Sequence, residues 1–385
     1  MSCRLRKKPK RMQSAHLCDE LIVEIFTRLP SKSLLRFRSL SKSWYSCIGS
    51  PDFIHMHTFR SRQKLLIRHR THKENEEGDL EEFYTLHPQD QLPLFRTHGY
   101  NDITPVQFPS THSNIIGSYN GLVCLFDYDE KSISLWNPSI RRKLTLPDCP
   151  RTCYSEVGIG FGFDPVIDDY KIVCVPERNR KKAGRSFVYA LKTNTWRRIA
   201  SATPLFSSVM TKPCFFNGVL YWLGHYDLTR TYYLLTFDLS THVFGSIALP
   251  FKTVLSVAPT PIQGSIAAVS SRAAPTPIQG SIPSLADFAN QIWLMKDASW
   301  SAFLNFKKDQ VRAHLSSVLQ LSTSDDLVFY SFCNGFQVYN LKIGEFSRLV
   351  DFNGAYFVFD VIQCLESLQL LGMGTACEGN KLTFS

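Results

Sequence analysis

Two pairs of histidines are the residues of this chain whose spacing comes nearest to that of a metal site. His55 and His57 are two positions apart, and His69 and His72 are three apart. A protein metal site needs further ligands, and neither pair has a matching set of Cys, Asp or Glu residues nearby. The spacing therefore predicts ordinary surface histidines and no bound metal.

Other patterns that could support catalysis are equally incomplete. The segment GIGFGF (158–163) looks like a nucleotide-binding loop, but its third glycine is misplaced, which favours a strand at a close backbone approach. The acidic groups that begin at Asp127 and at Asp164 fall where hairpin turns are expected. The sequence contains neither a P-loop nor a GxSxG turn. We expect no cofactor and no enzymatic activity.

The positive charge is concentrated in two short segments. The net charge is +10, with six bases in the first eleven residues and five more at 178–185. The rest of the chain has 32 bases against 33 acids, which excludes a broad basic groove for nucleic acid. Residues 1–13 are predicted to be a disordered basic tail, either simply solvated or a nuclear-import signal. The acidic segment 74–82 and the basic segment 178–185 are solvated loops or charged rims that steer a partner.

The cysteine content and the apolar runs predict a nuclear and cytoplasmic location. The chain has eleven cysteines, an odd number, and no CxxC pair; Cys149 and Cys153 are the closest together. This usage indicates free, mostly buried thiols in a reducing compartment. The basic start lacks the apolar core of a signal peptide, and no run reaches the length that spans a bilayer. We expect no membrane partner.

Residues 14–60 predict a small all-helical module. Asp19 can cap a first helix, whose apolar residues recur every four positions until Pro30 ends it. Ser31 or Ser33 can begin a second helix, and a third follows. Ser50 and Pro51 have the spacing of a helix start, with Phe53 as the buried anchor of a fourth.

This module has more apolar residues than so short a bundle can bury, because a core below about 40 residues rarely sustains itself without a partner. The surplus residues are Leu17, Leu21, Leu34 and Leu35. They pack either on the C-terminal part of the same chain or in the groove of a partner protein.

From residue 61 onward the sequence predicts an all-β domain. Six units recur, each with apolar strands, a turn and a closing strand, at the spacing of propeller blades of roughly 40–50 residues. Segment 359–373 has no closing hairpin of its own, and the unit that begins with 63–69 and 81–88 lacks inner strands. We expect them to form one blade from both ends of the chain, which closes the ring and removes its sheet edges.

One interval contains an exact internal repeat. APTPIQGSI occurs at 258–266 and again at 274–282. We expect residues 260–290 to form a duplicated loop segment. A 16-residue period is too short for a blade. We predict that the first copy is a strand, because GSIAAV continues as an apolar run, and that the second copy is a loop, because it meets Pro283.

The helical module resembles the F-box family at many positions of fixed spacing. The matching residues are Leu17, Glu20, Leu21, Ile25, Arg28, Leu29, Pro30, Lys32, Ser33, Leu34, Arg36, Phe37, Lys42, Trp44, Ile48, Pro51 and Phe53. Cys18 stands where the family usually has proline, and Leu40 where it usually has valine in an apolar seat. The resemblance implies docking to the Skp adaptor of a cullin–RING ubiquitin ligase. The adaptor-binding residues implied are Leu17, Leu21, Ile25, Leu29, Pro30, Leu34, Leu35, Lys42 and Trp44.

The second part is similar to the F-box-associated, kelch-like domain of plant F-box proteins. NGLVCL (120–125), LWNPSIRRKLTLP (135–147) and GFGFDPVIDDYKIV (160–173) carry this resemblance. Together the two parts imply an α+β multidomain chain: an F-box at 14–60 and a propeller of about six blades at 61–385. They also imply a non-catalytic receptor that holds an unknown target protein for ubiquitination.

Two alternatives from other classes stay open. A kelch-like propeller could bind carbohydrate or use a metal, which would require an aromatic pocket or converging ligands in its channel. The basic tail could instead bind DNA.

Overall fold

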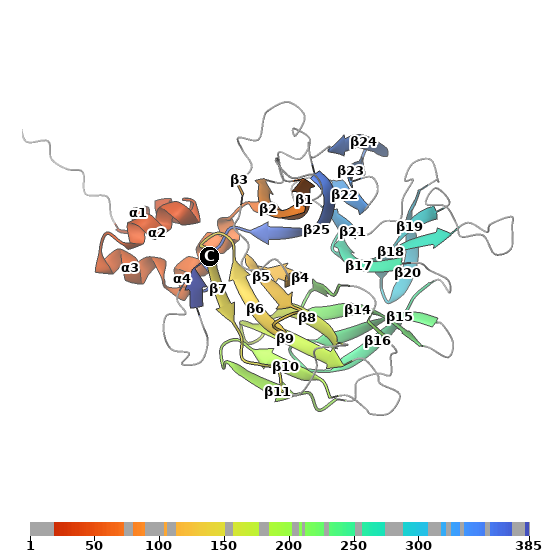
Figure 1. Cartoon of the computed structure of the whole chain (residues 1–385), viewed down its shortest axis with the longest axis horizontal. Coiled ribbons are helices and arrows are strands. Elements are labelled where there is room, and N and C mark those ends of the chain that lie inside the picture. The colour runs from red at the N-terminus through yellow and green to blue at the C-terminus, as the bar shows by residue number, and fades with distance from the viewer. Residues whose placement is uncertain are drawn as a thin grey trace, which may run out of the picture.

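Four helices are followed by six antiparallel sheets arranged in a ring (Figure 1). This is a computed structural model, and it describes residues 19–72, 80–88, 104–105, 113–150, 157–176, 185–201, 208–209, 212–226, 231–250, 256–273, 288–306, 317–320, 325–331, 335–350, 355–371 and 382–384. The predicted fold class, a small helical module before a six-bladed propeller, is confirmed.

The first, second and fourth helices begin at or next to the residues that the sequence predicts, and the third follows the second as expected. They are α1 (Asp19–Phe26), α2 (Ser31–Arg38), α3 (Lys42–Ile48) and α4 (Pro51–Arg60). The Ser41 hydroxyl accepts a hydrogen bond from the backbone N–H of Trp44 at 3.1 Å, and Ser50 does the same for Phe53 at 3.3 Å. Both are helix caps that satisfy an otherwise unpaired donor. The α2 helix differs, because the residue at its cap position is Pro30, which has no side-chain oxygen.

Each sheet is one blade, whose strands run in order from the inside of the ring to the outside. Blade 1 contains β25 (Ala355–Leu365), β1 (Gln63–His72), β2 (Leu80–Pro88) and β3 (Thr104–Pro105). Blade 2 contains β4 (Ser113–Tyr119), β5 (Leu122–Asp127), β6 (Ser132–Asn137), β7 (Arg142–Thr145) and β26 (Leu382–Phe384). Blade 3 contains β8 (Val157–Asp164), β9 (Asp169–Pro176), β10 (Phe187–Ala190) and β11 (Thr195–Arg198).

The other three blades follow the same plan. Blade 4 contains β12 (Ser208–Val209) and β13 (Cys214–Phe216), which both pair with β14 (Val219–Tyr226), then β15 (Thr231–Asp238) and β16 (Phe244–Ala248). Blade 5 contains β17 (Ser256–Ile262), β18 (Ser265–Ala273), β19 (Phe288–Lys296) and β20 (Ser299–Phe306). Blade 6 contains β21 (Ser317–Gln320), β22 (Asp326–Ser331), β23 (Gly335–Asn340) and β24 (Glu345–Val350).

Both ends of the propeller domain contribute to closing the ring. β25 pairs with β1, with Leu365 opposite Gln63, so blade 1 is built from the two ends as predicted. The short strand β26 adds to the outer edge of blade 2, with Leu382 opposite Leu144. The sequence analysis did not predict this second addition, which covers an otherwise open sheet edge.

Tight turns connect several inner strands to their neighbours. Asn120–Gly121, Asn217–Gly218 and Gln263–Gly264 all have positive φ angles, as a two-residue hairpin turn of the primed type requires. The third turn lies within the first copy of APTPIQGSI, which forms the β17–β18 hairpin as predicted. Its prolines lie on the edge strand β17, where a missing N–H is tolerated.

Several sequence predictions fall outside the described residues. These are the second copy at 274–282, the basic tail at 1–13, Leu17 and Cys18, and most of the two charged loops.

Glycines in β8 let neighbouring blades approach closely. A Cβ atom at Gly160 would lie 2.4 Å from the Trp222 ring, and one at Gly162 would lie 2.3 Å from Phe215. The glycine-rich segment is thus a strand in close contact with the next blade, as the spacing predicted. The approach is to side chains of blade 4 rather than to its backbone.

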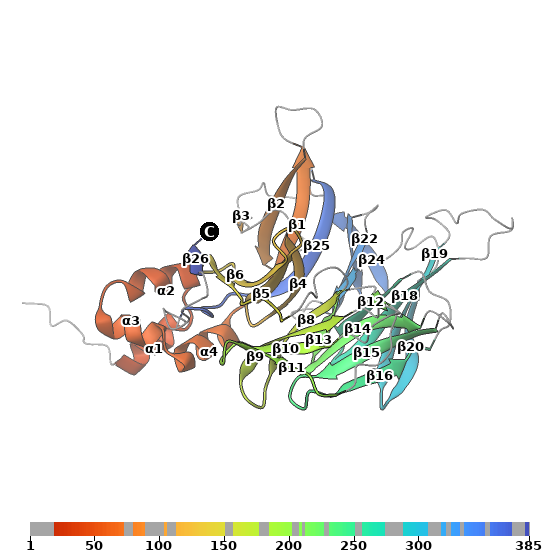
Figure 2. The ribbon, with the colours of Figure 1, turned by 60° about the horizontal axis from the view of Figure 1, so that its bottom comes forward.

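The helices pack against one face of the ring, beside blade 2 and the end of β25 (Figures 1 and 2). Leu34 is completely buried there and packs in one cluster with Ile140, Leu368 and Leu371 from the propeller domain. The described cysteines are free thiols, and five of the six are buried, which agrees with the prediction from cysteine usage.

Glu366, just after β25, provides the cap that α2 lacks. Its carboxylate accepts a hydrogen bond from the Ser31 backbone N–H at 2.6 Å and another from Lys64 Nζ at 3.0 Å. Burial alone would raise the pKa of Glu366, but the charge of Lys64 and the bond from Ser31 bring it below its ordinary value. The anion therefore stabilises the positive end of α2 and joins it to β1.

The segment after Glu366 lies between the helices and blade 2. The Asn137 amide donates to the Ser367 carbonyl at 3.1 Å and to the Gln369 carbonyl at 2.8 Å. Arg142 Nη1 donates to the Leu370 carbonyl at 2.8 Å. At Gly121 a Cβ would lie 2.4 Å from Ser367 Oγ, so the turn must be glycine for the segment to fit. Polar groups of blade 2 thus fix residues 366–371 in place.

His57 differs from its prediction as a surface histidine. Its side chain is only 2% exposed. The Nε2 atom lies 3.0 Å from the carbonyl of Leu29, a residue in the connection between α1 and α2. Burial lowers its pKa, while the bond to Leu29 and the charge of Glu366 oppose that shift. The Nδ1 atom has no hydrogen-bond partner. The position of residue 57 on the buried face of α4 explains why this histidine is buried.

We predict that Glu366→Gln loosens the junction between helices and propeller. The amide keeps the side-chain shape but removes the charge that Lys64 and the α2 N-terminus require, which costs about 1–2 kcal/mol of unfolding free energy. Urea unfolding measures the loss, and faster tryptic cleavage after Arg60 or Arg62 locates it. Glu345→Gln, an exposed position on β24, is the control. Equal cleavage rates in both variants would contradict this role.

We predict that acid weakens the packing of α4 within the helical module through His57. Because the folded-state pKa lies below that of the unfolded chain, about 6.5, the unfolded state binds more protons as pH falls through that value, and stability drops. His57→Gln keeps a donor for Leu29 and should show a smaller fall in melting temperature between pH 7.5 and 5.5. His55→Gln, on the exposed side of α4, should behave as the wild type. The same pH response in all three proteins would exclude His57 as the cause.

Candidate functional site

The helical module exposes a group of apolar side chains that the propeller does not cover. Leu21 is 51% exposed and Ile25 47% exposed, one turn apart on α1. Leu40 and Tyr45 lie on the α2–α3 turn and on α3, 71% and 57% exposed. We call these four residues the exposed apolar group. It lies on helices at the end of the molecule far from the blades, whereas α4 leads into β1 (Figure 2).

The interior of the module orients this group. Phe26 stacks on Phe37 and contacts Trp44, with ring centroids 4.9 Å apart in both pairs. The Arg38 guanidinium lies 3.8 Å from the centre of the Tyr45 ring, so a cation–π contact holds that ring at the surface. A packed aromatic centre thus fixes α1, α2 and α3 before any partner binds.

The structure divides the predicted adaptor-binding residues into three sets. Leu21, Ile25, Pro30 and Lys42 are exposed; Leu29, Leu35 and Trp44 are partly buried in the helical cluster. Leu34 has no exposed surface, which differs from the expectation of a docking residue. The reason is that the α2 face carrying Leu34 packs on Ile140 and Leu368. For this residue the other interpretation of the apolar surplus, packing on the same chain, is the correct one.

Sequence reasoning missed two members of the exposed apolar group. Leu40 was expected in an apolar seat, yet it is the most exposed of the four. The match of Leu40 to an apolar family position could have identified it. Tyr45 received no role, because no pattern in the sequence links it to Arg38, the residue that holds its ring. The exposure of both side chains became visible only when the packing of α2 against α3 was known.

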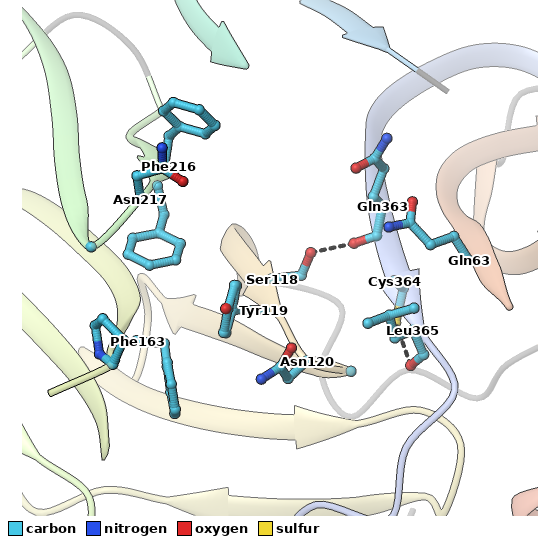
Figure 3. Close-up of a pocket in the computed structure, with 14 residues that line it drawn as sticks. Gln63, Ser118, Tyr119, Asn120, Phe163, Phe216, Asn217, Gln363, Cys364 and Leu365 are labelled. Atoms are coloured by element: carbon cyan, nitrogen blue, oxygen red, sulfur yellow. Dashed lines mark hydrogen bonds between the residues drawn. The ribbon is translucent and has the colours of Figure 1, made fainter. Parts of the chain in front are cut away.

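A cavity of about 520 Å³ lies on the helix side of the ring, between the inner strands of blades 1 to 4. Figure 3 shows Phe216 and Asn217 on one side and Gln63 and Gln363 on the other, with Tyr119 and Asn120 between them. Its described lining includes no Asp, Glu, Lys, Arg or His side chain. The lining residues are Gln63, Ser118, Tyr119, Asn120, Gly121, Phe163, Pro165, Phe215, Phe216, Asn217, Gly218, Gln363, Cys364 and Leu365.

The cavity wall offers no group suited to catalysis. Burial raises the pKa of the Cys364 thiol to about 12, so its thiolate is scarce near neutral pH. Ser118 donates its hydroxyl to the Gln363 carbonyl and has no base beside it among the residues that line the cavity. The arrangement can bind, but it has no activated nucleophile.

Charged groups beside the cavity form a structural ion pair. Lys171 Nζ donates to Asp164 Oδ2 at 2.6 Å and to the Leu239 carbonyl at 2.6 Å, and lies 2.9 Å from His242 Nε2. Burial alone would raise the pKa of Asp164, but bonds from Lys171 and Ser240 lower it overall. This buried cluster joins blade 3 to blade 4. The predicted turn at Asp164 is present, and the residue also locks two blades together.

No cluster suited to a metal occurs in the part of the chain that the structure describes. Among the same residues, no helix has the length and apolar character needed to cross a membrane. The acidic and basic loops that could steer a partner connect β1 to β2 and β9 to β10, and their tips lie outside the described ranges.

Comparison with known proteins divides the chain as the structure does. Residues 15–56 match the F-box domain, and residues 62–354 match the F-box associated beta propeller domain. The F-box protein At1g47790 of Arabidopsis thaliana is 26% identical over 376 residues, which cover 91% of this chain and 88% of that protein. F-box protein CPR1 of the same plant is 30% identical over 252 residues, covering 57% and 55%.

These matches fit the geometry of the two parts. F-box domains generally bind the Skp adaptor, and proteins that join an F-box to this propeller are generally non-catalytic adaptors of ubiquitin ligases. The four helices, the six blades and the relatives in Arabidopsis thaliana all agree with an F-box followed by this propeller. The chain therefore belongs to the family of F-box proteins that carry a C-terminal F-box-associated β-propeller domain.

Proposed function

We propose that this chain is a substrate-recognition subunit of a Skp–cullin–F-box ubiquitin ligase. The exposed apolar group on the helical module supports this most directly. Leu21 and Ile25 form a stripe that water would disfavour, and a partner helix groove would cover it. The propeller then holds a target protein for ubiquitination.

In this proposal the adaptor contacts are redistributed among the predicted residues. Leu21, Ile25, Pro30 and Lys42 contact the adaptor directly, and Leu40 and Tyr45 join them. The partly buried Leu29, Leu35 and Trp44 shape the surface from below, and Leu17 precedes the described residues. Leu34 contributes by joining the module to the propeller.

The contribution of the chain to the reaction is proximity. A receptor that docks to the ligase at one end and to the target at the other raises the effective concentration of target lysines near the ubiquitin-charged enzyme. A rigid junction increases this effect, because each freely rotating linker would dilute the target among unproductive orientations. We propose that the receptor works in both nucleus and cytoplasm, which the basic cluster at 7–11 supports.

We predict that Ile25→Asp abolishes binding of the Skp adaptor while the propeller stays folded. A carboxylate at this position of the exposed apolar group must lose its hydration when the partner covers it, which costs about 2–4 kcal/mol of binding free energy. Co-purification with the adaptor and titration calorimetry measure the loss. Ile343→Asp, 70% exposed on the β23–β24 turn, is the matched control.

The comparison with Leu34→Asp separates docking from folding. That change places a charge in the buried junction and should lower the melting temperature, whereas Ile25→Asp should leave it near the wild-type value. Normal adaptor co-purification with Ile25→Asp, at unchanged melting temperature, would refute the proposed docking surface.

A further inference from the structure

The cavity on the helix side of the ring has walls that are already in place. Tyr119 stacks on Phe163 with centroids 5.3 Å apart and meets the edge of Phe215 at 5.0 Å. These rings come from β4, β8 and β13, the inner strands of three successive blades. At about 520 Å³ the cavity falls within the roughly 300–1,000 Å³ of ordinary ligand pockets. It is therefore a preformed site that needs no rearrangement of its aromatic wall.

Four carboxamides line the cavity, together with the hydroxyl groups of Ser118 and Tyr119. Asn120 and Asn217 occupy equivalent places in two hairpin turns, and Gln63 and Gln363 lie across from them (Figure 3). A carboxamide has the same donor and acceptor as a peptide unit, so it can pair with main-chain N–H and C=O groups. The Gln363 amide nitrogen donates to the Gln320 carbonyl, so Gln363 offers a ligand its oxygen. A charged ligand would lose its hydration here without meeting an opposite charge in the lining. The chemistry of the wall thus favours an uncharged ligand rich in amide groups.

An exposed apolar turn extends the cavity outward. Pro165 lines the cavity, and the next two residues of the β8–β9 turn, Val166 and Ile167, are 76% and 52% exposed. Hairpin turns ordinarily carry polar residues, so two exposed branched aliphatic side chains need a reason. The β15–β16 turn lies beside them, because Ser240 donates to Asp164 at 2.6 Å, and it exposes Val243 by 54%. The buried Lys171 fixes both turns, so this apolar rim is rigid.

We propose that the cavity and this rim bind an uncharged peptide segment of the target protein, with an aromatic or branched aliphatic residue as its anchor. The anchor packs on the aromatic wall, the carboxamides pair with the peptide backbone, and flanking apolar residues cover Val166 and Ile167. A sugar would use the aromatic wall and the amides but would gain nothing from the aliphatic rim. The inference rests on the proposed receptor function and assigns target recognition to the helix-facing side of the ring.

The location places recognition next to the junction. Leu365 lines the cavity, and the next residue, Glu366, caps α2; Gln63 also lines it and precedes Lys64, which pairs with Glu366. A peptide bound here therefore lies within one or two residues of the contacts that orient the F-box. The target would be presented at a fixed geometry relative to the ligase.

The test uses the full-length chain in complex with the Skp adaptor, panned against a phage library of random short peptides. Enriched peptides are synthesised, and their affinities are measured by fluorescence polarisation. We expect uncharged peptides with an aromatic or branched aliphatic residue. Asn217→Asp and Val166→Asp should each weaken their binding by about tenfold or more. Aspartate tolerates the positive φ of residue 217, so the turn should survive.

Two matched variants control for added charge. Gln263→Glu occupies the equivalent turn of blade 5, and Ile343→Asp an exposed turn of blade 6; neither lines the cavity, and both should bind within about twofold of the wild type. Melting temperatures exclude misfolding. Charged consensus peptides, equal binding to all variants, or no enrichment at all would overturn the proposal. So would binding to a glycan array that Asn217→Asp abolishes.

Adaptor co-purification is measured on the same samples and separates this inference from the proposed function. Variants of the cavity should retain the adaptor, whereas Ile25→Asp should lose it and still bind the peptides. A chain that retains the adaptor but binds no peptide refutes the cavity alone.

Discussion

The partly buried carboxylate of Glu366 is the polar link between the two parts of this protein, beside the apolar packing of Leu34. Glu366 accepts a hydrogen bond from the first backbone N–H of α2 and lies 3.0 Å from Lys64 Nζ. Pro30 leaves the start of α2 without a side-chain cap, so this helix end would be buried and unpaired without the distant anion. The cap comes from 335 residues further along the chain. The start of α2 in the F-box therefore depends on a residue of the propeller domain, although the two regions match separate family models.

The strand before Glu366 has three roles that depend on one another. β25 closes the ring by pairing with β1, its last residues line the cavity, and the segment after it packs between Asn137 and the helices. Ring closure therefore also sets the orientation of the F-box. This arrangement suits a receptor that acts by proximity. Leu365 lines the cavity and the next residue, Glu366, caps α2, so the distance between the docking face and the recognition face is fixed.

Much of the fold could be predicted because it follows local rules. Serine caps, the Ser50–Pro51 helix start, asparagine–glycine turns and repeating strand patterns each depend on neighbours in sequence. Side-chain environments could not be predicted in the same way. Leu34 and Ile25 both belong to the apolar pattern of the module, yet one is fully buried and the other 47% exposed. His57 looked like its neighbour His55, and only the contact of α4 with the connection between α1 and α2 distinguishes them.

The sequence by itself determined the two-part organisation, the number of blades and the docking module. The strand repeats and the spacing of the F-box residues can both be read directly from the sequence. Tertiary structure alone decided which apolar residues remain for a partner, because that depends on what the opposite face of each helix touches. It also revealed the cavity, whose walls come from residues 63 to 365. Ring closure brings these distant residues together, and no local pattern records that proximity.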